Sequence, residues 1–197
     1  QTLEVTWNNG SLVLDSKNTN YSFGSLQRIL RYGLHHIGFE NVKTMNQILV
    51  LGVAGGSVIQ TLRYEIEHKN LIIGVEIDEH IIKLANTYFN LDKIPNTQII
   101  RYDAFEFILA TKKLFDLVIV DLFEDTRMPA FQYENHFWFR LAQILSKNGK
   151  VLFNTMELTP EQTQKNQHLK HAISHLFEVD MLKKVEVHNQ LIILTKK

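Results

Sequence analysis

Short apolar segments alternate with amphipathic segments over most of this chain. The nearly continuous apolar runs are residues 48–51, 71–77, 97–102, 115–122 and 151–153. The segments between them carry apolar residues at helical spacing, as in Ile81, Ala85 and Phe89. Buried strands that alternate with amphipathic helices favour right-handed crossovers and a mostly parallel sheet covered on both faces. The pattern therefore predicts an α/β protein with a Rossmann-like, doubly wound sheet.

The two ends of the chain depart from this alternation. Residues 3–15 resemble two short strands around the turn Asn8-Asn9-Gly10, and an amphipathic helix follows. Near the other end, residues 179–187 and 191–195 are strand-like runs joined by three residues, too few for a parallel crossover. We therefore expect a β-hairpin and helix extension over residues 1–40. Residues 41–197 should form the main domain, whose sheet ends in an antiparallel hairpin.

Composition narrows the class of protein. At 197 residues the chain fits one domain with a full hydrophobic core. It has no cysteine, which excludes disulfides and cysteine nucleophiles and makes the cytoplasm the simplest location. Its 21 basic residues balance 21 acidic ones, which argues against a broad nucleic-acid surface. No apolar run approaches the roughly 18 residues that a membrane-spanning helix needs. We expect small-molecule chemistry, without nucleic-acid or membrane partners.

A glycine-rich turn follows the first apolar run and reads Gly52-Val53-Ala54-Gly55-Gly56-Ser57. Glycines let the backbone approach a ligand closely and leave amides free at the start of the next helix. Ala54 stands at the second glycine of the dinucleotide pattern Gly-x-Gly-x-x-Gly, so that pattern is not met. A tight turn without a ligand remains an alternative interpretation of this segment by itself.

Acidic side chains stand at the ends of the next three apolar runs. Glu76 follows the glycines by about 20 residues, where an acid meets the ribose hydroxyls in nucleoside sites. Asp103 can accept a hydrogen bond from an adenine amino group or cap the following helix. Asp121 ends a run that is otherwise apolar, and a charge there belongs in a cleft. We expect these groups to share one crevice with the glycine turn, beyond the carboxyl ends of the strands.

The segment from Ile48 to about Phe153 resembles the spermidine synthase branch of the class I S-adenosylmethionine-dependent methyltransferase fold. The blocks that carry the resemblance are residues 51–58, 75–82, 102–107 and 115–124. The resemblance implies a seven-stranded sheet that ends in the antiparallel hairpin already predicted. It also implies S-adenosylmethionine, or its decarboxylated form, as the cofactor.

The resemblance further implies a role for each strand end. Glu76 should bind the ribose, and Asp103 with Ala104 should hold the adenine. The acid that matches Asp121 deprotonates the accepting amine, and Glu124 stands where a second acid helps to hold it. Tyr21 is a further candidate for the acceptor pocket. The residues expected to contact the cofactor are Gly52, Val53, Ala54, Gly55, Gly56, Ser57, Glu76, Ile77, Asp103, Ala104 and Asp121.

One position departs from the family pattern. Aminopropyltransferases usually read Gly-Gly-Gly-Asp-Gly in the glycine turn, and that Asp binds the amine of the decarboxylated donor. Gly55 stands in its place here. The acid would attract a cationic aminopropyl tail and repel the carboxylate of the intact donor, so its absence removes both effects. We therefore place methyl transfer to a small, amine-bearing acceptor first and aminopropyl transfer second.

Other interpretations stay open beside these two. A non-catalytic, nucleoside-binding member of the fold is the third hypothesis, because a fold does not imply an activity. A nicotinamide dehydrogenase is disfavoured by Ala54 and by the terminal hairpin. His168, His171 and His175 share one helical face, which we interpret as solvated, so no metal is expected. The expected partner is a small-molecule acceptor, and a homodimer is left open.

Overall fold

A seven-stranded sheet forms the centre of the molecule. The computed structural model describes residues 3–8, 11–16, 20–123, 127–186 and 188–197. Across the sheet the strands run in the order β6 (Thr97–Arg101), β5 (Leu71–Glu76), β4 (Gln47–Leu51), β7 (Phe115–Val120), β8 (Leu145–Met156), β10 (Asn189–Lys196) and β9 (Phe177–Val185). The first five are parallel to one another, and β10 pairs antiparallel with both β8 and β9. The predicted mostly parallel sheet with an antiparallel C-terminal hairpin is confirmed.

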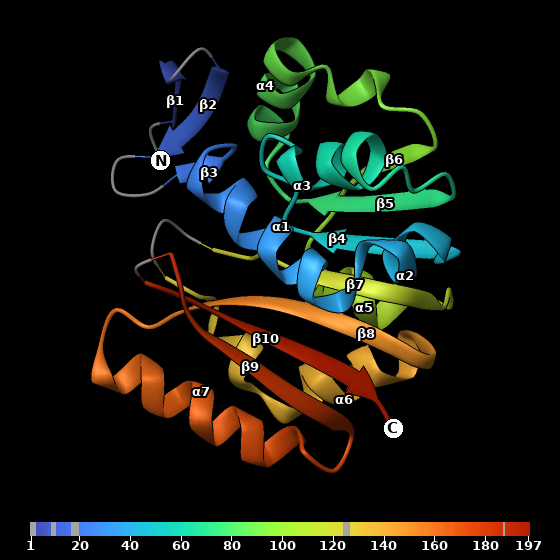
Figure 1. Cartoon of the computed structure of the whole chain (residues 1–197), viewed down its shortest axis with the longest axis vertical. Helices are drawn as coiled ribbons and strands as arrows, with labels where there is room; N and C mark the ends of the chain where they lie inside the picture. Colours follow the sequence, from blue (N-terminus) through green and yellow to red (C-terminus); the bar gives the residue numbers. More distant parts are fainter. Residues whose placement is uncertain (1–2, 9–10, 17–19, 124–126, 187) are drawn as a thin grey trace.

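Helices cover both faces of this sheet (Figure 1). One face packs against α1 (Ser25–Ile37), α2 (Phe39–Thr44), α3 (Ser57–Gln60) and α4 (Glu79–Phe89). The other packs against α5 (Ala104–Ala110), α6 (Asn135–Ile144) and α7 (Pro160–Ile173). Successive strand residues point to opposite faces, so Val50 joins the first core while Leu49 and Leu51 join the second. This is why the strands read as continuous apolar runs.

The strand order reverses between β4 and β7. The chain adds β5 and β6 on one side of β4, then crosses to add β7 and β8 on the other. The helices that leave these two neighbouring strands lie on opposite faces, which opens a crevice at their carboxyl ends. The crevice therefore lies where the sequence predicts one.

A small antiparallel sheet precedes the central one and comprises β1 (Leu3–Asn8), β2 (Ser11–Ser16) and β3 (Asn20–Ser22). β1 and β2 pair as the predicted hairpin, with Asn8 opposite Ser11. β3 was not predicted from the sequence. In Figure 1 this sheet lies beyond the N-terminal end of α1, on the side toward which the arrows of β4 and β5 point. It thus stands close to the carboxyl ends of the parallel strands.

Three short helical turns complete the connections. A π-helical turn, η1 (Thr61–Glu65), continues α3, so the single helix predicted after the glycine turn is divided. The 3-10 turns η2 (Leu91–Lys93) and η3 (Ala130–Tyr133) follow α4 and precede α6. β8 is also longer than the predicted residues 151–153.

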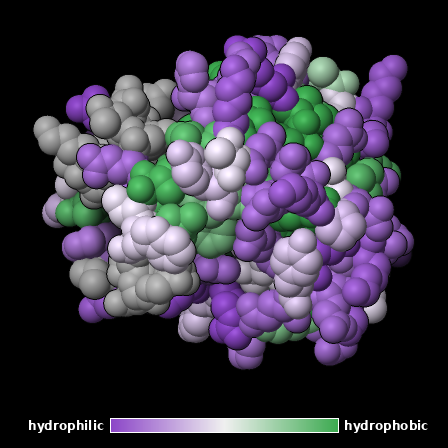
Figure 2. All heavy atoms as spheres, turned by 90° about the horizontal axis from the view of Figure 1, so that it is seen from above, coloured by the Kyte–Doolittle hydropathy of each residue, from purple (hydrophilic) through white to green (hydrophobic). Residues whose placement is uncertain are grey.

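The surface carries both hydrophilic and hydrophobic side chains. Figure 2 shows hydrophilic side chains over much of the face seen from above, with hydrophobic side chains in smaller patches between them. Within the described residues, no helix is both long and apolar enough to cross a membrane.

Candidate functional site

A pocket of about 620 Å³ opens at the carboxyl ends of β4, β5, β7 and β8. Predicted cofactor-contact residues that line it are Gly52, Ala54, Glu76, Ile77, Asp103, Ala104 and Asp121. Val53, Gly55, Gly56 and Ser57 are buried within the turn and do not line the pocket. The four strand ends singled out from the sequence therefore meet in one crevice.

The glycine turn brings β4 and β7 into close contact. Gly52 has φ +85°, and a Cβ atom there would lie 2.1 Å from the carbonyl oxygen of Asp121. Only glycine fits this position without moving the end of β7. The turn is also bonded to the end of β5, because the backbone amides of Val53 and Ala54 donate to the carboxylate of Glu76. The turn thus fixes two carboxylate-bearing strand ends relative to each other.

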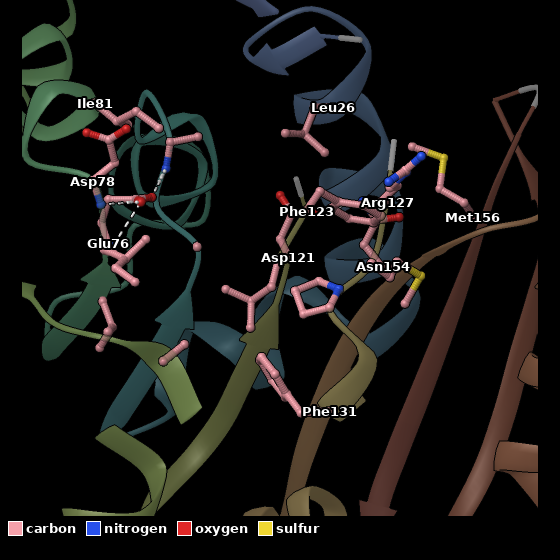
Figure 3. A pocket seen from close by; sticks show the side chains of 18 of the residues that line it. Leu26, Glu76, Asp78, Ile81, Asp121, Phe123, Arg127, Phe131, Asn154 and Met156 are labelled. Atoms are coloured by element: carbon pink, nitrogen blue, oxygen red, sulfur yellow. Dashed lines mark hydrogen bonds between the residues drawn. The ribbon is translucent and has the colours of Figure 1, made fainter. Parts of the chain in front are cut away.

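Glu76 is held by four backbone hydrogen bonds. Its Oε2 accepts from Val53 and Ala54 at 3.1 Å each, and its Oε1 accepts from Ile77 at 2.9 Å and Asp78 at 3.1 Å. Figure 3 shows Glu76, with bonds to other residues that line the pocket, at one end of the pocket. The side chain is only 8% exposed. Such a network orients a carboxylate that would otherwise be costly to bury.

Asp103 caps α5 while it faces the pocket. Its Oδ1 accepts from the backbone amides of Phe105 at 2.8 Å and Glu106 at 3.0 Å. Both bonds use the same oxygen, and within the described residues Oδ2 accepts none. The two functions weighed from the sequence, helix cap and ligand contact, are therefore compatible in one side chain. Asp78 similarly caps α4 by accepting from the backbone amide of His80 at 2.7 Å.

Asp121 lies in the middle of the pocket, and its carboxylate accepts a hydrogen bond at the end of a series of two buried amide side chains. Asn154 Nδ2 donates to Asp121 Oδ1 at 2.9 Å, and Asn189 Nδ2 donates to Asn154 Oδ1 at 2.9 Å. Burial raises the pKa of the Asp121 carboxyl to about 6; the Asn154 bond opposes this rise and the charge of Glu76 adds to it. A carboxylate with this pKa is suited to accept and release a proton near neutral pH.

The position of Gly55 explains why no acid stands there. A Cβ atom on Gly55 would lie 2.8 Å from Ser22 Cβ and 2.9 Å from Ser22 Oγ. The same Ser22 hydroxyl accepts from the backbone amide of Ser57 at 3.3 Å. The space that an aspartate side chain would need is therefore filled by β3, which packs directly on the glycine turn.

Several pocket residues were not singled out from the sequence. Asn154 and Met156 come from the end of β8, Asn189 from the start of β10, and Leu26 and Ile29 from α1. Asn154 carried a usable signal, because it is a polar residue at the end of an apolar run, like Asp121. Asn189 carried none, since a polar residue in a hairpin is ordinary. The role of α1 depends on tertiary packing that periodicity does not reveal.

Two predicted acceptor residues are not placed. Glu124 lies outside the described residues, and so does the side chain of Tyr21, of which only the backbone in β3 is described. His168 and His171 in α7 are exposed, and so is His175 in the turn that follows it. Across the described ranges, no three histidine, aspartate or glutamate side chains gather into a metal-binding group.

The chain resembles one family over most of its length. A model of the spermine/spermidine synthase domain matches residues 29–188. A probable polyamine aminopropyl transferase from Bifidobacterium longum is 27% identical over 132 residues, which cover 67% of this chain and 29% of that protein. The polyamine aminopropyltransferase of Vibrio vulnificus is 30% identical over 115 residues, which cover 55% of this chain and 37% of that protein. The chain thus spans about a third of the length of these relatives.

Solved structures with the same fold come from two kinds of enzyme. A probable spermidine synthase from Corynebacterium glutamicum superposes with a TM-score of 0.78 at 14% identity, over 99% of this chain and 76% of that one. The structure of human methyltransferase-like protein 13 in complex with SAH superposes with a TM-score of 0.72 at 17% identity. The match covers 88% of this chain and 83% of that one. These likenesses concern the fold. Because the domain model covers most of the sequence, this chain belongs to the spermine/spermidine synthase domain family, which has the class I S-adenosylmethionine-dependent methyltransferase fold.

Proposed function

We propose that this protein transfers an alkyl group from an S-adenosyl sulfonium donor to an amine, with Asp121 as the general base. The observation that carries the proposal is the position of Asp121. It lies in the pocket between β4 and β8, bonded to Asn154, with a pKa of about 6. A base whose pKa is near the working pH combines a useful ionised fraction with a useful affinity for the proton.

The described residues fit an adenosyl donor. Glu76 is a fixed carboxylate beside the glycine turn, where ribose hydroxyls would replace some of its backbone hydrogen bonds. Asp103 has an oxygen that its capping bonds do not use, suited to an amino group on adenine. Ile77, Ile81 and Ala104 add apolar surface to the same end of the pocket. We propose that these residues hold the nucleoside, and that Glu124 and Tyr21 contribute to the acceptor side.

The proposed reaction needs little from the protein beyond alignment and one proton transfer. A bound adenosyl sulfonium supplies an electrophilic carbon, and the carbon–sulfur electron pair leaves with sulfur as a neutral thioether. Asp121 accepts a proton from the ammonium form of the acceptor, which frees the nitrogen lone pair to form the new carbon–nitrogen bond. Asn154 holds Oδ1 of Asp121, so that Oδ2 is the oxygen left for this proton.

Aminopropyl transfer from the decarboxylated donor is the finer proposal. The residue at position 55 favours methyl transfer, but the match to the spermine/spermidine synthase domain and the relatives named aminopropyltransferases support aminopropyl transfer better. Methyl transfer remains the second candidate because of one observation. Ser22 fills the space beside Gly55, where an acid for the aminopropyl amine would stand.

Titration calorimetry with intact and decarboxylated S-adenosylmethionine tests which donor binds. Identification of the nucleoside product then tests which group is transferred. We expect binding of an adenosyl donor and release of 5′-methylthioadenosine from the decarboxylated form. A strong preference for the intact donor, with S-adenosylhomocysteine as product, would instead establish methyl transfer. If neither donor binds, the transferase proposal is wrong and the non-catalytic hypothesis gains support.

The division of the chain is also a proposal. Residues 1–40 would form an extension that covers the pocket, because Ser25, Leu26 and Ile29 of α1 line it. Residues 41–197 would form the donor-binding domain. Limited proteolysis with and without S-adenosylhomocysteine tests this division, since a covering extension should be cleaved more slowly when the pocket is filled.

A further inference from the structure

The pocket has opposite charges at its two ends. Figure 3 shows Glu76 and Asp78 on one side of Asp121, and Arg127 and Met156 on the other. All five residues line the same pocket. The nucleoside end is therefore acidic, and the opposite end presents a guanidinium group.

Arg127 is the one basic side chain among the described residues that line the pocket. Within the described part of the chain, its guanidinium forms no ion pair or hydrogen bond. By contrast, three arginines each form an ion pair with a glutamate on the surface: Arg28, Arg31 and Arg101. Among the described residues, none occupies the hydrogen-bond donors of the Arg127 guanidinium, and we treat these donors as open to a ligand.

Other residues that line the pocket define what else a ligand must carry. Leu26, Ile29 and Met156 are apolar, and Asn189 adds a buried amide already bonded to Asn154. The pocket acids Glu76, Asp78 and Asp103 all belong to β5, β6 and their following turns, at the nucleoside end. A ligand that spans Asp121 and Arg127 therefore meets a carboxylate and a cation in a pocket whose lining is also partly apolar.

We propose that the acceptor is an amine that also carries a carboxylate, with Arg127 as the residue that selects it. This inference rests on the proposed function and names the substrate class of the same site. The amine lies at Asp121, a short aliphatic segment packs on the apolar walls, and the carboxylate pairs with Arg127. A guanidinium matches a carboxylate with two parallel hydrogen bonds. It repels a second ammonium group at the same place, so simple diamines are disfavoured.

Matched pairs of ligands test the proposal by calorimetry. The pairs are 4-aminobutanoate with 1,4-diaminobutane and 5-aminopentanoate with 1,5-diaminopentane, which differ only in the charge of the far end. The chain is first saturated with 5′-methylthioadenosine, which has no carboxylate to occupy Arg127. We expect the amino acid of at least one pair to bind about tenfold more tightly than its diamine, as a charge-assisted pair permits.

Two variants separate Arg127 from general charge effects. Arg127→Gln should remove the preference, because the amide keeps polarity but loses the charge. Lys112→Gln removes one positive charge in the turn before β7, at the other end of that strand, and should keep the preference. Arg127 and Lys112 are both exposed, so both variants should unfold at the wild-type temperature.

Several outcomes would overturn the proposal. One is a diamine that binds at least as tightly as its amino acid; another is a preference that survives in Arg127→Gln. A third is failure of both series to bind. If Arg127→Gln weakens S-adenosylhomocysteine but not the amino acids, Arg127 recognises the donor's carboxylate instead. Titrations repeated without nucleoside keep the test independent of the proposed function, which fails separately if 5′-methylthioadenosine does not bind.

Discussion

Burial raises the pKa of the Asp121 carboxyl to about 6, and Glu76 adds to the rise while Asn154 opposes it. A carboxyl group with this pKa is half ionised near pH 6, and the fraction that can accept a proton grows as the pH rises above 6. The same burial disfavours its charged form in the folded protein. Function and stability therefore place opposite demands on one side chain.

The rate of transfer should follow the ionisation of Asp121. We expect kcat to rise as the pH increases through about 6 and then to level, because the carboxylate is the form that removes the proton. Asp121→Asn should lower kcat by about 10²- to 10⁴-fold, the usual contribution of a general base. Product formation between pH 5 and 8.5 measures both effects. A rate in Asp121→Asn close to that of the wild type would remove Asp121 from the mechanism.

The stability of the fold should change in the opposite sense. The ordinary pKa of aspartate is 3.8 and the folded value is about 6, so ionisation of Asp121 costs folding free energy as the pH rises through this window. Asp121→Asn should therefore be more stable than the wild type above pH 6, by about 1–3 kcal/mol, and similar to it below pH 4. Urea unfolding at pH 4 and 7.5 measures the difference. An equal effect at both pH values would show that it does not come from the charge.

Asn154 should tune the same ionisation. Its amide donates to Asp121 and accepts from Asn189, so Asn154→Ala removes the bond that favours the carboxylate. The pH profile of kcat should then shift upward by about one unit. Thr155→Val is the control on the neighbouring residue, because it breaks buried bonds to Gln190 and Asn166 but not to Asp121. It should lower stability and leave the profile in place; a shift in both variants would argue against a specific role.

At the scale of elements, β3 and the glycine turn act as one unit. Ser22 accepts from Ser57 and occupies the space beside Gly55. Gly55→Ala should therefore destabilise the fold by about 1–3 kcal/mol through overpacking. In a Ser22→Gly background the cost should be smaller, because the contacting side chain is gone. A double-mutant cycle by chemical unfolding measures this coupling, and strictly additive effects would contradict the contact.

Elements with strong local patterns were predictable from the sequence. The continuous apolar run of residues 115–122 identifies β7, and the three-residue link at 188–190 predicts that β10 is antiparallel. β3 was missed because three residues carry no periodicity of their own and are fixed by pairing with β2. The acidic strand ends were predictable because charge after an apolar run is unusual. Arg127 and α1 reach the pocket through tertiary packing, which no local pattern records.

At the scale of the molecule, the pocket joins segments from almost the whole chain. Its lining comes from α1, from the turns after β4, β5, β6 and β7, and from β8 and β10. A ligand there contacts both helical layers and both sides of the strand reversal. Binding energy should therefore stabilise the fold as a whole, because the unfolded chain has no such site.

This linkage gives the last prediction. At a free concentration of about 100 times Kd, S-adenosylhomocysteine should add about 2.7 kcal/mol to the free energy of unfolding. For a chain of this length, that corresponds to a rise in Tm of about 5–10 °C in a scanning calorimeter. Asp103→Asn gives a matched control, because asparagine also caps helices but would direct its own amide donors toward the adenine amino group. Its rise in Tm should be smaller at the same ligand concentration, with the ligand-free Tm nearly unchanged. An equal rise in wild type and variant would remove Asp103 from the nucleoside site, and an equal rise with NADH would favour a dinucleotide instead.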